Sequence, residues 1–149
     1  MPVLTRAYVV GGVSAGGASA DSNSFTATAA EDLQAGKLVY ITGAGTAMHA
    51  RADVFASTVA IGMVEEAVTS GNTATIRTHG SVTLVNWSAV VGSGSLSVGS
   101  LYFLSPTLAG CMTTTTPLAG SGHYIAFVGI AQSAQTFHFE RGQILRRHS

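Results

Sequence analysis

The sequence predicts an all-β domain, either a small barrel or a sandwich. Short runs rich in β-branched and aromatic residues recur along the chain, and glycine, serine, asparagine and proline separate them. No segment shows sustained helical periodicity with caps. At 149 residues, the chain has room for one compact domain with an arm at either end.

Eight runs carry the strand signal. The run 25–29 alternates, as expected of a strand with one buried face. The β-rich run 37–41 ends at a glycine-containing turn, and 73–78 alternates until it meets His79-Gly80. One turn of helix is expected at 31–35. The full set of expected strands is 25–29, 37–41, 58–64, 73–78, 81–87, 101–104, 124–128 and 136–140.

The chain divides into an arm, a domain and a tail. Residues 1–24 are mostly small or polar after an apolar start, so we expect an arm that is flexible or is ordered by a partner. An end without any role is the alternative. Residues 25–142 are expected to form a single β domain, and residues 143–149 a basic C-terminal tail.

The domain contains an internal repeat. The segments 33–41 and 96–104 share a pattern of leucine, two residues, glycine, one residue, leucine and then a strand. Likewise, 60–67 matches 127–134, with a glycine at the third position of each. We expect a turn glycine with positive φ, and a strand glycine that permits a bulge or a close backbone approach. The two halves of the repeat span about 31–80 and 94–142.

Charge is scarce, because charged residues make up 9% of the chain, against about 25% in an average soluble domain. The formal net charge is zero and 46% of the residues are hydrophobic. Such a surface does little to keep copies apart, so we expect part of it to be buried against partners. The neutral balance gives no indication of direct nucleic-acid binding, in spite of the basic C-terminal end.

The chain carries no signal for a membrane or for secretion. No apolar stretch approaches the ~18–20 residues of a spanning helix, and the start lacks the features of a signal peptide. The single cysteine, Cys111, excludes an intrachain disulfide and is expected to be a small buried hydrophobe. We therefore expect synthesis in a reducing cytoplasm.

No constellation of residues predicts catalysis, a metal or a cofactor. There is no nucleophile elbow and no phosphate-binding loop. Glu65 and Glu66 are adjacent, so in a strand they would point to opposite faces. The five histidines show no metal-ligand spacing, and His79 and His138 are expected on polar faces, although a cluster across a symmetry axis is left open.

A contact surface is the functional feature that the sequence does suggest. Trp87 follows an apolar strand and is expected in the core or at a subunit interface, while stacking on a sugar is its alternative role. Apolar residues at the start of the arm favour docking on a partner. The expected interface residues are Val3, Leu4, Tyr8, Val9, Val10 and Trp87.

Parts of both halves resemble structural modules of tailed bacteriophages. In the second half, the resemblance lies in Leu96-x-x-Gly99-x-Leu101-Tyr102-Phe103-Leu104-Ser105, in the hairpin 109–117 (AGCMTTTTP) and in Val128-Gly129-x-Ala131-x-Ser133-Ala134. The first half, with 33–39 and 61–64, is similar to the corresponding element of capsid cement proteins. Together the matches cover residues 31 to about 140.

The resemblance implies a head-decoration protein with a β-tulip-like fold and no enzymatic activity. Such proteins are often homotrimers, and they sit on the outer surface of the expanded capsid, where they bridge major capsid protein subunits. The implied partners are thus the major capsid protein and further copies of this chain, with no membrane, nucleic acid or cofactor. A tail or head fibre that docks host glycans through Trp87 is the alternative, and a sugar-cleaving hydrolase that uses Glu65 and Glu66 is a remote third.

Overall fold

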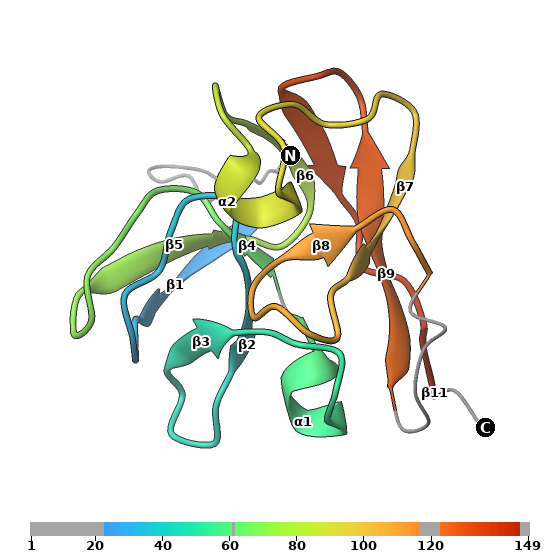
Figure 1. Cartoon of the computed structure of the whole chain (residues 1–149). Coiled ribbons are helices and arrows are strands. Elements are labelled where there is room, and N and C mark those ends of the chain that lie inside the picture. The colour runs from blue at the N-terminus through green and yellow to red at the C-terminus, as the bar shows by residue number, and fades with distance from the viewer. Residues whose placement is uncertain (1–22, 61, 117–122, 147–149) are drawn as a thin grey trace, which may run out of the picture.

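The computed structural model describes residues 23–60, 62–116 and 123–146, which form two antiparallel sheets packed as a sandwich (Figure 1). The all-β prediction is confirmed in its sandwich form, and the sheets do not close into a barrel. Two helices of one turn each complete the described part, and they are α1 (Phe55–Thr58) and α2 (Ser88–Val91).

The first sheet comes from the first half of the chain and the second sheet from the second half. The first has the order β1-β5-β4-β2-β3. Its strands are β1 (Ser24–Thr28), β2 (Leu38–Ile41), β3 (Ala47–His49), β4 (Gly62–Val64) and β5 (Thr73–Arg77). The second has the order β6-β10-β9-β7-β8, and β11 pairs with the start of β9. Its strands are β6 (Gly80–Thr83), β7 (Leu101–Leu104), β8 (Met112–Thr113), β9 (Tyr124–Ala131), β10 (Thr136–Phe139) and β11 (Ile144–Arg146).

The two sheets have the same strand order, so the repeat seen in the sequence corresponds to a structural duplication. The register agrees as well, because Val39 pairs with Gly62 in the first sheet and Tyr102 pairs with Gly129 in the second. Each structural unit begins one strand earlier than the sequence pattern indicated, since β1 and β6 occupy corresponding edges. The units therefore span 24–77 and 80–139.

Glycines build the repeated unit in the two ways that the sequence predicted. Gly36 and Gly99 adopt φ values of +84° and +77° in the turns before β2 and β7, a conformation that L side chains rarely adopt. A side chain at Gly62 or at Gly129 would overlap a backbone carbonyl of the next strand. These strand glycines allow the neighbouring backbones to approach closely.

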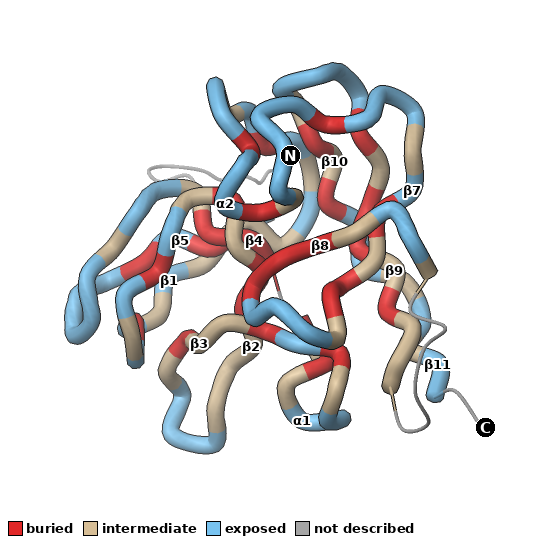
Figure 2. Tube along the Cα trace, viewed as in Figure 1, coloured by how far each residue is buried: buried red, intermediate tan, exposed pale blue. Residues whose placement is uncertain are grey.

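The main core lies between the two halves and is formed by side chains of both sheets. Figure 2 shows the buried positions in red. Trp87 and Phe137 are fully buried in it, with ring centroids 6.1 Å apart. A second, smaller core lies within the first sheet and contains Leu33, Val39, Val64 and other residues. This sheet curls enough for Ala29, just after β1, to bridge to β3 at its opposite edge.

Three local predictions are wrong. The turn of helix expected at 31–35 is absent, because Leu33 is buried and exchanges two backbone hydrogen bonds with Val68. The strand expected at 58–64 begins only at Gly62, since the Thr58 N–H and hydroxyl both donate to the Val54 carbonyl and close a helical turn. The strand expected at 81–87 ends at residue 83.

Three short strands, β3, β8 and β11, lie outside the runs that the sequence indicated. Strand β11 falls within the segment expected to be a tail, and it pairs with Tyr124–Ala126 of β9. The described residues of that segment are thus part of the second sheet.

Candidate functional site

The structure describes one of the six residues expected at an interface, and that residue lies in the core. Val3, Leu4, Tyr8, Val9 and Val10 lie outside the described residues. Trp87 is fully buried, and its indole Nε1–H donates to the Gln135 carbonyl at 2.9 Å. Of the two positions expected for Trp87, the core and a subunit interface, the structure shows the core, and the ring is not exposed for stacking on a sugar. Its core position satisfies both the apolar ring and the polar N–H.

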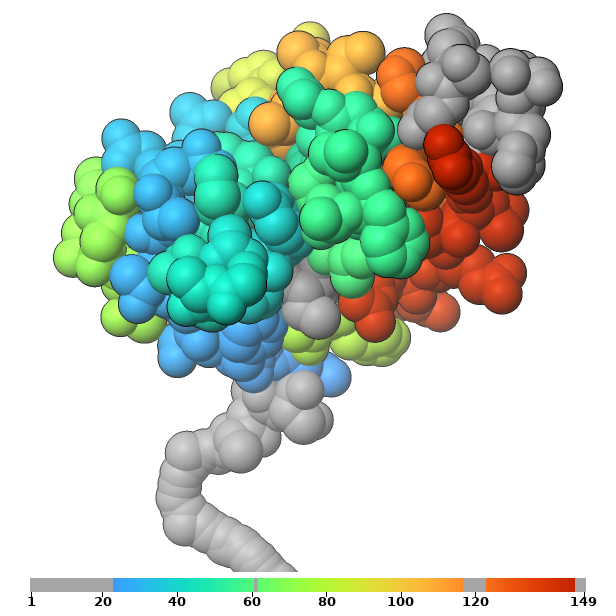
Figure 3. All heavy atoms as spheres, turned by 90° about the horizontal axis from the view of Figure 1, so that it is seen from below, coloured from blue at the N-terminus to red at the C-terminus, as the bar shows by residue number. Residues whose placement is uncertain are grey.

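Two neighbouring exposed apolar side chains lie at α1, in the green region that borders the red C-terminal strands in Figure 3. Val54 and Phe55 are 57% and 58% exposed, and the Phe55 ring lies 5.8 Å from the ring of Tyr124. Tyr124 pairs with Arg146 of β11, whereas Leu145, which is 54% exposed, is opposite Ile125 and so points to the other face of this strand pair. We call Val54, Phe55 and Tyr124, which lie where α1 meets the β9–β11 pair, the α1–β11 surface.

The backbone before α1 fixes this surface relative to both sheets. The Ala50 N–H donates to Leu38 of β2, and the Ala52 N–H donates to Ser105 just after β7. The Ala52 carbonyl in turn accepts the N–H of Tyr124 at 2.9 Å. Segment 50–52 is thus tied to both halves, and the helical turn that follows projects Val54 and Phe55 into solvent.

An ion pair stands beside the α1–β11 surface. Arg51 pairs with Asp53, immediately before α1. The hydrogen bond from Arg51 holds the pKa of the Asp53 carboxyl below its usual value. Apolar side chains next to a charged margin are the arrangement found at many protein–protein interfaces.

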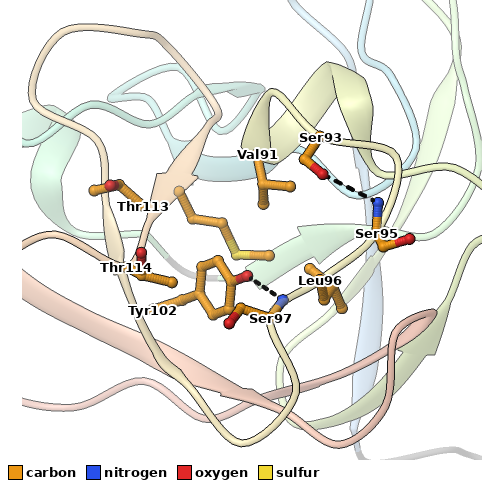
Figure 4. Close-up of a pocket in the computed structure, with 9 residues that line it drawn as sticks. Val91, Ser93, Ser95, Leu96, Ser97, Tyr102, Thr113 and Thr114 are labelled. Atoms are coloured by element: carbon orange, nitrogen blue, oxygen red, sulfur yellow. Dashed lines mark hydrogen bonds between the residues drawn. The ribbon is translucent and has the colours of Figure 1, made fainter.

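A pocket of about 420 Å³ lies beside the connection from α2 to β7 (Figure 4). The Tyr102 hydroxyl points into it and accepts the backbone N–H of Ser97 at 2.9 Å. Among the residues that the structure describes, the lining offers hydroxyl groups and apolar surface, without a carboxylate, imidazole, thiol or amine. Such a lining suits hydrogen bonding and supplies no general base of ordinary strength. The lining consists of Val91, Ser93, Ser95, Leu96, Ser97, Tyr102, Met112, Thr113 and Thr114.

A polar cluster occupies the seam between the halves. The Lys37 ammonium donates to the Cys111 thiol sulfur at 3.2 Å, and the thiol donates to the Ala89 carbonyl at 3.4 Å. Cys111 is buried, as expected, but it has polar partners. Glu31 accepts the backbone N–H of His49 at 2.9 Å and lies 3.4 Å from its Nδ1. Burial lowers the pKa of His49, and the attraction of Glu31 only partly opposes this effect.

Glu65 and Glu66 line one hollow of about 200 Å³, together with Arg77. The two residues do not lie in a strand, because β4 ends at Val64, so the alternation expected of a strand does not apply to them. The Glu65 carboxylate lies 2.8 Å from Nε of Arg77, so these two side chains form an ion pair.

Two histidines meet on the second sheet, which the sequence did not indicate. The rings of His79 and His138 contact edge to face, with centroids 5.1 Å apart, and Glu140 lies beside them. The sequence separation of 59 residues hides this cluster, because only the pairing of β6 with β10 brings it together. A known pairing of these two strands would have revealed it.

No family model matches this chain, and no curated protein is significantly similar to it. In the part of the chain that the structure describes, no helix has the length and apolar character needed to cross a membrane.

Proposed function

We propose that this chain is a structural subunit of a tailed-phage virion that binds the outer surface of the expanded capsid. In this role it stabilises the head by bridging neighbouring major capsid protein subunits, and it acts by contact alone, without a cofactor. The observation that carries the proposal is the α1–β11 surface, an exposed apolar end on a chain with 9% charged residues. The phage-like segments within the duplicated sheets give further support.

Contact of this kind stabilises a shell by removing apolar area from water. Each square ångström of apolar surface that is buried contributes about 25 cal/mol before the entropic costs of association. A standard protein interface buries roughly 1,600 Å² in total, so many copies together would brace a shell strongly. Because salt screens charges and not apolar contacts, we expect binding to the capsid to persist at raised ionic strength.

The experiment is to add the purified full-length chain to expanded heads that lack it and to count the bound copies. We expect hundreds of copies per head, together with a higher temperature of head disruption. Unexpanded heads are the control, and they should bind few copies. A handful of copies on expanded heads would contradict the proposal and favour a tail or head fibre. The burial of Trp87 removes the ring on which a glycan-docking role was based.

Self-association is the second part of the proposal. We expect a homotrimer, because three copies around one axis are the arrangement that the resemblance implies. Sedimentation equilibrium of the free protein measures the oligomeric state directly. A monomer at all concentrations would contradict the trimer, whereas capsid binding is tested separately by the count of bound copies.

A further inference from the structure

Strand β10 and the residue that follows it carry two potential metal ligands, His138 and Glu140. Phe137 and Phe139 are fully buried, and side chains alternate along a strand, so His138 points away from the core. Glu140 follows directly after β10, and its carboxylate oxygen lies 3.6 Å from Nε2 of His138. The two side chains therefore present their donor atoms together.

The adjacent strand supplies a third donor. Gly80, the first residue of β6, pairs with Phe139, which places His79 next to this end of β10. The His79 ring meets the His138 ring at an interplanar angle of 87°. One donor atom from each of His79, His138 and Glu140 lies within 4.8 Å of the other two. Three donor groups at the adjoining ends of β6 and β10 thus lie close together.

The distances and donor types suit a particular class of ion. Tetrahedral zinc with bonds of about 2.0–2.1 Å to nitrogen and oxygen separates its ligands by about 3.4 Å. The separation of His138 and Glu140 is already close to this value. His79 and Glu140 are exposed, so rotation of their side chains meets little packing. Imidazole nitrogen favours zinc and its neighbours over magnesium or calcium, which prefer oxygen ligands alone.

We propose that His79, His138 and Glu140 bind a divalent transition-metal ion of the zinc type on the outer face of the second sheet. Three protein ligands leave a fourth position open, which water or a donor atom from another molecule fills. The ion joins the start of β6 to the end of β10. The first sheet lacks this set, because the register places Arg77 where the second sheet has His138.

The test is titration of the full-length chain, without a histidine tag, with ZnCl₂ in a calorimeter. We expect one ion per chain with a Kd of roughly 1–10 µM, and no heat with MgCl₂. His138→Ala and Glu140→Gln should weaken binding about tenfold or more. His123→Ala is the matched control, since it removes an imidazole near the start of β9, and its affinity should equal that of the unchanged chain.

A second measurement needs no variant. In a proton NMR spectrum of the five histidines, zinc should shift the ring signals of two of them, and His79→Ala should identify one of the pair. Absence of binding at about 100 µM zinc would overturn the proposal. Equal weakening by His123→Ala and His138→Ala would also overturn it, as would signal shifts in all five histidines alike. Circular dichroism confirms that each variant is folded.

Discussion

The carbonyl oxygen of His138 occupies the space in which a side chain at Gly129 would begin. The Arg77 carbonyl stands in the same relation to Gly62 in the first sheet. The close approach thus occurs between β4 and β5 in the first sheet and between the corresponding strands, β9 and β10, in the second. It is therefore a property of the repeated unit.

Replacement of Gly129 by alanine should destabilise the fold. The new methyl group would overlap the His138 carbonyl and press on the Phe137 ring, and the φ of +151° is one that alanine rarely adopts. We expect a loss of about 2–4 kcal/mol in the free energy of unfolding, measured by urea titration. Gly43→Ala is the control, since a Cβ there has no neighbour within 4 Å, and it should change stability by less than about 0.5 kcal/mol. Equal stability of the two variants would contradict the packing described.

The core position of Trp87 can be read from its fluorescence. It is the only tryptophan, and it is fully buried, so its emission should be blue-shifted and resistant to acrylamide until the chain unfolds. Trp87→Phe removes the hydrogen bond to the Gln135 carbonyl and leaves a small cavity, which should cost about 2–3 kcal/mol. Ready quenching in the folded protein would place the ring at the surface instead.

Stability should fall as the pH drops below about 6.5, the ordinary pKa of histidine. Burial lowers the pKa of folded His49, while Glu31 and Lys37 act on it in opposite directions. The unfolded chain then binds the proton more readily than the folded chain, so protons favour unfolding between the two pKa values. Urea titrations from pH 7.5 down to 5.5 measure this slope. His49→Gln should make the slope shallower with the other histidines left in place, and an unchanged slope would exclude His49 as its source.

The α1–β11 surface should tolerate a charge in the free protein and not in the assembly. Phe55 is 58% exposed, so Phe55→Glu should change the free energy of unfolding by less than about 0.5 kcal/mol. Burial of that charge against a capsid should weaken binding about tenfold or more, measured as copies retained on expanded heads. Val85→Glu is the matched control, because Val85 is 87% exposed and lies outside this surface. If both variants bind alike, another face makes the contact.

Much of the fold could be predicted because the repeat carries its own local signals. The glycines at 36 and 99 mark turns, and the alternating runs around 73–78 and 136–140 mark strands. The strand Met112–Thr113 is too short to show alternation and lies in a run of threonines. Helix α1 was missed because the surrounding residues favour strands. Its single turn depends on the hydrogen bond that the Thr58 hydroxyl donates to the Val54 carbonyl.

The sites were harder to predict, because pairing between distant strands creates them. The polar faces expected for His79 and His138 agree with their exposure, but nothing local indicates that β6 and β10 are neighbours. Trp87 illustrates a different limit. Its position after an apolar run suits an interface and a core equally well, and only the packing of distant residues such as Phe137 against the indole ring shows that it lies in the core.

The matching strand orders of the two sheets mean that each strand position in one half has a counterpart in the other that is free to diverge. Leu38 is fully buried, whereas its counterpart Leu101 is half exposed. Arg77 forms an ion pair with Glu65, whereas its counterpart His138 contacts His79. One copy of the unit can thus preserve the scaffold while the other acquires a new role, and a comparison of the two halves is an internal guide to which residues hold the scaffold and which have specialised.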